Sequence, residues 1–181
     1  YYSIPLNDKH YGKGFTDWLN VAKSIPQWTG HYQPRLPADI GFYDLTNINV
    51  IKRQVELANM YGIYGFCFHY YWFSGKKLLE KPINILLENK NINMPFCVCW
   101  ANENWSTQWD GGNRQIIMKQ ELKSDDGDKF FNDILPLIRD DRYIKINNKP
   151  VLIIYKPDLF NKNLFLNFIS KLREKSKVNG F

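Results

Sequence analysis

Three continuous apolar runs mark the chain, at residues 63–71, 96–102 and 150–156. Runs of this kind, without polar alternation, are typical of strands that are buried on both faces of a parallel sheet. Between them, apolar residues recur three or four positions apart, which indicates amphipathic helices. We expect these helices over residues 47–61, 78–89, 124–139 and 161–177. The alternation predicts an α/β fold whose three strands are parallel neighbours, because short helical crossovers join them.

Polar residues mark the ends of these helices. Asn47 is the expected N-cap of the first helix, and Gly62 is its expected stop. Ser124 is expected to cap the third helix, whose first turn carries Asp126 and Asp128 to suit the helix dipole. Residues 115–119 are expected to form a short extended piece.

Each apolar run ends in residues that can carry chemistry. These endings are residues 69–72, residues 102–105, and the pair Tyr155 and Lys156. Polar groups at the carboxyl ends of consecutive parallel strands are typical of a TIM (β/α)8 barrel, whereas a doubly wound sheet concentrates ligands at one switch point. We therefore expect a single domain over residues 1–181 that forms the first half of a TIM barrel. A doubly wound sheet is the alternative.

Residues 1–46 lack a clean period, and a structureless segment of this length is unusual unless it is functional. Its aromatic residues and prolines predict an ordered excursion packed over a cleft, with βα units following over residues 47–181. We expect four of its residues to lie on the same side of the molecule as Trp105. They are Trp18, His31, Tyr32 and Arg35. Because the chain starts without methionine and stops at a Gly-Phe pair, we expect it to be a fragment of a longer protein.

The stretch at residues 95–105 changes abruptly from a buried strand to amides, a carboxylate and indoles. Strand alternation places Cys97, Cys99 and Glu103 on one face. A buried carboxylate must be paired, whereas one at a strand end can open into a ligand cleft. Carboxylates and amides suit sugar hydroxyls, and an indole suits the C–H face of a sugar ring. The alternative is that Glu103 caps a helix or pairs with a lysine.

Glu103 is the candidate catalytic residue. The candidate substrate-binding residues are His69, Tyr71, Trp72, Asn102, Asn104, Trp105, Trp109, Asp110 and Tyr155. Glycoside chemistry needs two carboxyl groups, so a partner for Glu103 is expected beyond Phe181, with Asp110 as a distant second choice. His69 could bond a sugar hydroxyl, act as acid or base, or be satisfied within an aromatic cluster.

Composition excludes several other functions. The net charge of +6 is spread along the chain without a basic stripe, which argues against nucleic-acid binding and leaves an acidic glycan open. No run approaches the roughly 20 apolar residues of a membrane span. The cysteines at positions 67, 97 and 99 suit small buried apolar residues in a reducing compartment, so we expect a cytoplasmic protein. Asp126 and Asp128 form a D-x-D pattern in a helix rather than at a strand end, and we expect neither a metal nor another cofactor.

The motifs of this chain resemble those of the WbsX family, and the resemblance covers nearly the whole chain. It is carried by residues 12–23, 30–39, 41–45, 62–67, 69–73 and 96–105. That family is described as a glycosyltransferase of bacterial surface-polysaccharide (O-antigen, lipopolysaccharide) biosynthesis. It is also described as glycoside hydrolase family 99-like, after the barrel family of endo-α-mannosidases.

The resemblance implies a TIM barrel and a carbohydrate-active enzyme acting at a glycosidic bond on a glycan or sugar substrate. It also implies that the main catalytic carboxylates lie in a later Trp-Asn-Glu-Trp segment, which this chain lacks. Glu103 is then expected to bind substrate or support catalysis rather than act alone. Hydrolysis by a family 99-like endo-glycosidase is the first alternative to transfer, and a non-catalytic glycan-binding barrel is the second.

Overall fold

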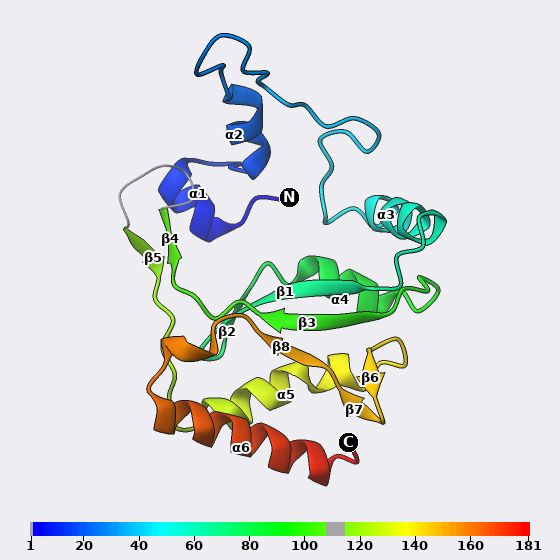
Figure 1. Cartoon of the computed structure of the whole chain (residues 1–181), viewed down its shortest axis with the longest axis vertical. Coiled ribbons are helices and arrows are strands. Elements are labelled where there is room, and N and C mark those ends of the chain that lie inside the picture. Colours follow the sequence, from blue (N-terminus) through cyan, green and yellow to red (C-terminus); the bar gives the residue numbers. More distant parts are fainter. Residues whose placement is uncertain (1, 108–114) are drawn as a thin grey trace.

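The computed structural model describes residues 2–107 and 115–181. Its centre is a four-stranded sheet in the order β2-β1-β3-β8 (Figure 1). The strands of this sheet are β1 (Phe66–Phe73), β2 (Lys76–Leu78), β3 (Phe96–Trp100) and β8 (Leu152–Ile154). Two small antiparallel hairpins accompany it. They pair β4 (Trp105–Ser106) with β5 (Ile116–Met118), and β6 (Lys145–Ile146) with β7 (Lys149–Pro150).

Six α-helices connect or precede these strands in the described residues. Two short ones, α1 (Pro5–Tyr11) and α2 (Asp17–Lys23), lie in the N-terminal segment, which the sequence pattern left without elements. The other four match the expected helices: α3 (Ile48–Met60), α4 (Lys81–Glu88), α5 (Asp126–Ile138) and α6 (Lys162–Val178). A 3-10 turn at Pro157–Leu159 follows β8.

The predicted parallel arrangement is confirmed. β1 pairs with β3 in parallel, with His69 opposite Cys99, and β3 pairs with β8 in parallel, with Cys99 opposite Ile153. The start of β1 approaches β3 closely, since a Cβ added to Gly65 would lie 2.5 Å from the carbonyl oxygen of Pro95. The third strand is shorter than expected, because Lys149 and Pro150 belong to the β6–β7 hairpin.

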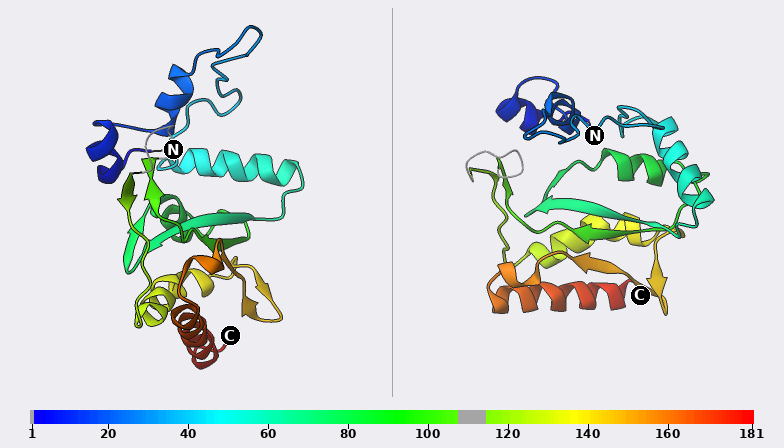
Figure 2. Two further views of the ribbon diagram at one scale, coloured as in Figure 1. Left: turned by 60° about the vertical axis from the view of Figure 1, so that its left-hand side comes forward. Right: turned by 45° about the horizontal axis from the view of Figure 1, so that its top comes forward.

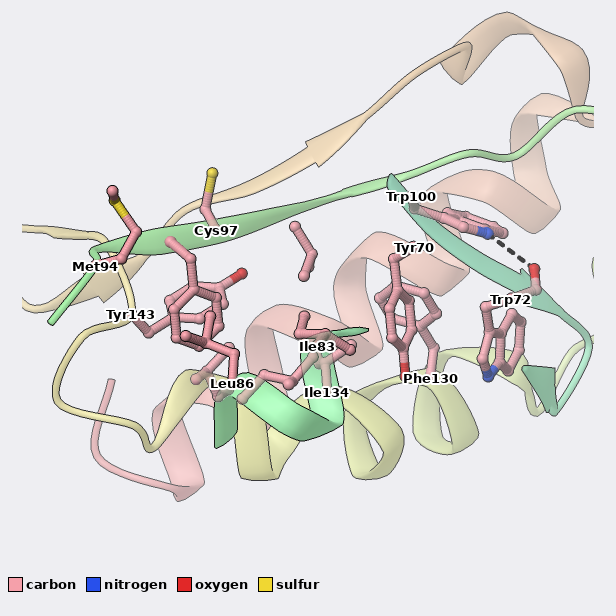
Figure 3. Close-up of a cluster of buried hydrophobic side chains, with 14 of the residues drawn as sticks. Tyr70, Trp72, Ile83, Leu86, Met94, Cys97, Trp100, Phe130, Ile134 and Tyr143 are labelled. Carbon is pink, nitrogen blue, oxygen red and sulfur yellow. Dashed lines mark hydrogen bonds between the residues drawn. The ribbon is translucent and has the colours of Figure 1, made fainter. Parts of the chain in front are cut away.

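The two faces of the sheet differ in cover. Side chains on one face, such as Trp72, Val98 and Trp100, are fully buried in the core with residues of α4, α5 and α6. Figure 1 shows α5 and α6 side by side beneath the sheet, and the second view of Figure 2 shows the same layering. On the other face, Cys67 is exposed and Ile153 is 42% exposed. Cys97 points toward this other face, away from α5 (Figure 3).

Of the two expected N-caps, Asn47 is confirmed and Ser124 is wrong. The side chain of Asn47 accepts a hydrogen bond from the backbone N–H of Asn49 at 2.9 Å, as an N-cap does. Ser124 does not cap α5, whose N-cap position is Asp125. The buried carboxylate of Asp126 holds this end instead, because it accepts a hydrogen bond from the backbone N–H of Lys123 at 2.8 Å.

The helix expected from residue 78 begins later, at Lys81, because β2 turns back and pairs antiparallel with the end of β1. Ser74 and Gly75 make this turn with positive φ angles of 47° and 98°. The described residues form a mixed α/β structure with a parallel sheet and do not close into a barrel. No described helix is both long and apolar enough to cross a membrane.

Candidate functional site

A hollow of about 730 Å³ runs along β1, from Phe66 at its start to Phe73 at its end, and reaches the residues that follow β3. It continues past α3 and α4 to the N-terminal helix α1. Among its lining residues are His69, Tyr71, Glu103, Asn104, Trp105 and Tyr155, so most of the predicted site residues meet here. They meet because parallel strands bring their carboxyl ends to one edge of the sheet.

Four aromatic rings form a continuous ledge in this hollow. The ring of Tyr71 stacks on Trp105 with centroids 5.4 Å apart and planes 25° apart. His69 lies 6.1 Å from Tyr71 and 6.2 Å from Tyr155, measured between ring centroids. Side chains two residues apart on a strand share a face, which is why His69 and Tyr71 stand together. His69 is exposed.

Glu103 stands in the same hollow and pairs with Lys156. The Lys156 ammonium donates a hydrogen bond to Glu103 Oε1, and the two side chains are 45% and 33% exposed, respectively. The hydrogen bond to Glu103 raises the pKa of Lys156 above its ordinary value. Glu103 lines the hollow with an acceptor that can bind hydroxyl groups, whereas Lys156, which is not among the lining residues, pairs with this carboxylate.

Asn102 fixes the backbone that carries Lys156. Its amide nitrogen donates to the Lys156 carbonyl at 2.6 Å, and its amide oxygen accepts from the Lys156 backbone N–H at 2.8 Å. These two bonds join the segment after β3 to the segment after β8. Lys156 is itself clamped and Glu103 directly follows Asn102, so the clamp explains why the charged pair forms.

Two predicted substrate-binding residues lie away from the hollow's surface. Trp72 is fully buried on the helix-covered face, where its indole N–H donates to Asp133 Oδ2 at 2.7 Å. The prediction took residues 69–72 together, although strand alternation sends Trp72 to the face opposite Tyr71. The side chain of Asn102 is also fully buried and is satisfied by the Lys156 backbone. It positions the site rather than presenting an amide to a ligand.

Three predicted site residues remain, and one further residue of the site was not predicted. Asn104 is exposed, and its side-chain oxygen accepts from the backbone N–H of Gln120 at 2.7 Å. Trp109 and Asp110 lie outside the described residues. Lys156 was missed as a site residue, because a lysine after a strand carries no distinctive local signal. Its position two residues after the end of β8 and directly before a 3-10 turn was the available clue.

The N-terminal segment contributes one wall of the hollow. Asn7 and Tyr11 of α1, together with Phe15 and Tyr43, line it. We expected Trp18, His31, Tyr32 and Arg35 to lie on the same side of the molecule as Trp105. None of these four residues lines the hollow. Tyr32 is 72% exposed, and Trp18 donates its indole N–H to the carbonyl of Tyr43 at 2.9 Å.

The cysteines lie on the sheet face below Glu103 and are free thiols. Burial raises the pKa of the Cys97 thiol to about 12, so it is an inert apolar group at neutral pH. Cys99 is also buried, as expected, whereas Cys67 is exposed, contrary to expectation, because the first part of β1 has no cover on that face. The described residues contain no group of three or more His, Cys, Asp or Glu side chains arranged to hold a metal ion.

Comparison with known proteins agrees with the motifs. A family model described as "Glycosyltransferase WbsX" matches residues 1–181. Two proteins of Xanthomonas campestris pv. campestris, from strains B100 and ATCC 33913, are each 45% identical to this chain over 159 residues. Both carry the description "Uncharacterized protein WxcX", and the match covers 88% of this chain but 23% of each relative. The chain thus spans about a quarter of their length.

No solved structure matches the chain. The family model nevertheless matches the whole chain, in agreement with the resemblance found in its motifs. The candidate site lies at the ends of the strands that carry these motifs. The chain belongs to the WbsX glycosyltransferase family.

Proposed function

We propose that this chain forms part of a carbohydrate-active enzyme that acts at a glycosidic bond in bacterial surface-polysaccharide biosynthesis, as a WbsX-type glycosyltransferase. O-antigen or lipopolysaccharide is the product class that the family description suggests. One observation carries the proposal: Glu103 stands beside a stacked Tyr71–Trp105 ledge in a hollow of about 730 Å³. Its volume falls within the roughly 300–1,000 Å³ typical of small-molecule sites.

In this proposal, the aromatic ledge holds the apolar face of a sugar ring, and Glu103 accepts a hydrogen bond from a sugar hydroxyl. Transfer then proceeds when an acceptor hydroxyl forms a bond to the anomeric carbon and gives up its proton. The leaving group departs with the electron pair of the bond that breaks. Glu103 can take up the proton as a base or orient the hydroxyl, and Lys156 keeps the carboxylate in place. A second carboxyl group would come from the rest of the protein.

We also propose that the sheet is an arc of a TIM barrel. Support comes from the sequential order of β1, β3 and β8, all parallel, and from the packing of α4, α5 and α6 against one face while Cys67 and Ile153 on the other face are exposed. In a barrel, the face that carries Cys99, Ile153 and Glu103 would point inward, toward the active-site mouth. This architecture favours hydrolysis of a glycosidic bond as the second candidate, since family 99-like hydrolases are barrels.

The test is the kinetics of Glu103→Gln in the full-length protein, with a synthetic glycan as substrate. If Glu103 takes part in proton transfer, kcat falls by roughly a hundredfold or more. If Glu103 binds a hydroxyl in the ground state, KM rises while kcat changes little. Glu174→Gln is the matched control, because Glu174 is exposed on α6 and lines neither the hollow nor the ledge. An unchanged kcat and KM in Glu103→Gln would refute the proposal, and an inactive parent that still binds glycans would support a non-catalytic barrel.

A further inference from the structure

A second hollow lies against the same segment. It has a volume of about 350 Å³ and is lined by residues from three parts of the chain: the segment after β3, the segment around β5, and the segment after β8. Glu103, Asn104 and Ser106 line both hollows. These three residues therefore form a common wall, with the aromatic ledge on one side and the second hollow on the other.

The second hollow combines an aromatic floor with polar walls. Phe160 lines it and is fixed in place by stacking on the buried Trp100, with centroids 5.5 Å and planes 17° apart. Ile116 and Leu159 add apolar surface, and both are about half exposed. Asn104, Ser106 and Glu103 supply the polar rim. As in the first hollow, an aromatic ring is available for the C–H face of a sugar, and polar groups are available for its hydroxyls.

Gln120 has an amide that is left without a partner at this hollow. Its backbone N–H is held by Asn104 Oδ1 at 2.7 Å, which places the residue against the wall. Both its side-chain oxygen and its side-chain nitrogen are buried and have no hydrogen-bond partner. Buried amides are nearly always paired, so an unpaired donor and acceptor on one flexible side chain need an explanation. Because Gln120 lines the hollow, a rotation of this side chain toward it is what the pairing of both atoms with ligand hydroxyls requires.

We propose that the second hollow is a second sugar subsite, in which Gln120 binds two hydroxyl groups of the ring that rests on Phe160. A glycan would then cross the wall at Glu103, with one ring on the Tyr71–Trp105 ledge and the next ring in the second hollow. The bond between the two rings would lie beside the carboxylate. This inference rests on the proposed function and specifies its substrate: a chain of at least two sugars rather than a single one.

The test is the dependence of affinity on glycan length, measured by isothermal titration calorimetry with α- and β-linked hexose oligomers of one to four units. The wild-type protein should bind a dimer about tenfold more tightly than the matching monomer. Gln120→Leu and Gln120→Glu should abolish this gain and leave monomer affinity within about twofold. Gln115→Leu, at an exposed glutamine on the same segment that lines neither hollow, should retain the gain. Thermal unfolding confirms that each variant is folded.

The possible outcomes separate the two claims. If the wild type binds glycans but the gain from monomer to dimer persists in both Gln120 variants, the subsite is refuted and the proposed function stands. Equal affinity of the wild type for monomers and dimers also refutes the subsite alone. If no oligomer binds to the wild type, both the proposed function and the subsite are overturned.

Discussion

Two carboxylates mark opposite ends of β3, and their surroundings differ sharply. At its amino end, Asp140 has a side chain that is 1% exposed and pairs with Arg142 and Lys90. Arg142 also donates to three backbone carbonyls, and its own carbonyl accepts from the N–H of Phe96, the first residue of β3. At the carboxyl end, Glu103 is 33% exposed and has one charged partner, Lys156.

The two surroundings suit different roles: the Asp140 pair is placed to stabilise the sheet, and we propose that the Glu103 carboxylate binds a ligand. The Asp140 cluster is enclosed, and its hydrogen bonds tie α4 to the start of β3. The Asp140 and Arg142 side chains are 1% and 9% exposed, so neither is accessible to a ligand. The Glu103–Lys156 pair is open to a hollow, so its remaining hydrogen-bonding capacity is available. In barrel proteins, features at the amino ends of the strands serve stability, whereas the carboxyl ends carry the chemistry.

The largest expected effect is the loss of Arg142. Arg142→Met leaves the Asp140 charge buried with Lys90 as its remaining charged partner in the described residues and removes donors from the carbonyls of Leu86, Asn89 and Ile92. The free energy of unfolding should fall by roughly 3–5 kcal/mol, the usual cost of breaking a buried pair. Urea denaturation measures it. Arg53→Met, at an exposed pair with Glu56, is the control and should cost at most about 0.5 kcal/mol. Equal losses of unfolding free energy in the two variants would contradict the claim that the buried cluster stabilises the fold more than an exposed pair does.

Next in size is the clamp at the carboxyl end. Asn102→Leu removes both bonds to the Lys156 backbone and leaves a buried donor and acceptor unpaired, at a cost of roughly 1–3 kcal/mol. Because the clamp positions Lys156 beside Glu103, glycan affinity should fall as well. Calorimetric titration and denaturation on the same sample check both effects. A destabilised variant with full glycan affinity would show that Asn102 has a structural role alone.

Acid should lower the free energy of unfolding through Asp140, at the amino end of β3. The bonds to Arg142 hold the pKa of Asp140 well below its ordinary value. A depressed folded-state pKa stabilises the fold above the unfolded-state value near 4, and this stability is lost as pH falls through the folded-state value. The wild type should lose about 1 kcal/mol from this group between pH 7 and pH 3. Asp140→Asn should lack that part of the decline, as unfolding free energies at the two pH values would reveal. An identical decline in wild type and variant would contradict the assignment.

The smallest effect on stability is expected from Lys156→Met. The pair with Glu103 is well exposed, so its loss should change the free energy of unfolding less than Arg142→Met or Asn102→Leu does. The raised pKa of Lys156 means that its contribution is present below the ordinary lysine pKa and is lost as pH rises through the raised value. A wild-type-minus-variant difference that shrinks only in strongly alkaline solution is the expected result. A difference that vanishes already at neutral pH would contradict it.

The sequence predicted the features that depend on local pattern. The three apolar runs became parallel neighbours, and Asn47 caps its helix. Glu103 was assigned either to a cleft or to a lysine pair, and the structure has both at once, because the pair itself borders the hollow. The error at Trp72 came from disregarding strand alternation.

What the sequence could not predict depends on contacts between distant residues. Arg142 bonds to carbonyls 50–56 positions away, and Asn102 clamps a residue 54 positions away. No local sequence pattern around Arg142 or Asn102 predicts such a distant partner. The β2 strand was missed because three residues are too few to show alternation, although the Ser74–Gly75 turn before it was a usable signal.

The most direct test of the central claim is a paired measurement on Glu103→Gln: its affinity for hexose oligomers by calorimetric titration, and its free energy of unfolding by urea denaturation. Glu103 pairs with one exposed lysine, so stability should change by less than about 1 kcal/mol. Affinity should fall by about tenfold or more, because a charged acceptor for sugar hydroxyls is lost. Unchanged affinity together with a loss of stability as large as that of Arg142→Met would place Glu103 with Asp140 as a structural carboxylate and contradict the account.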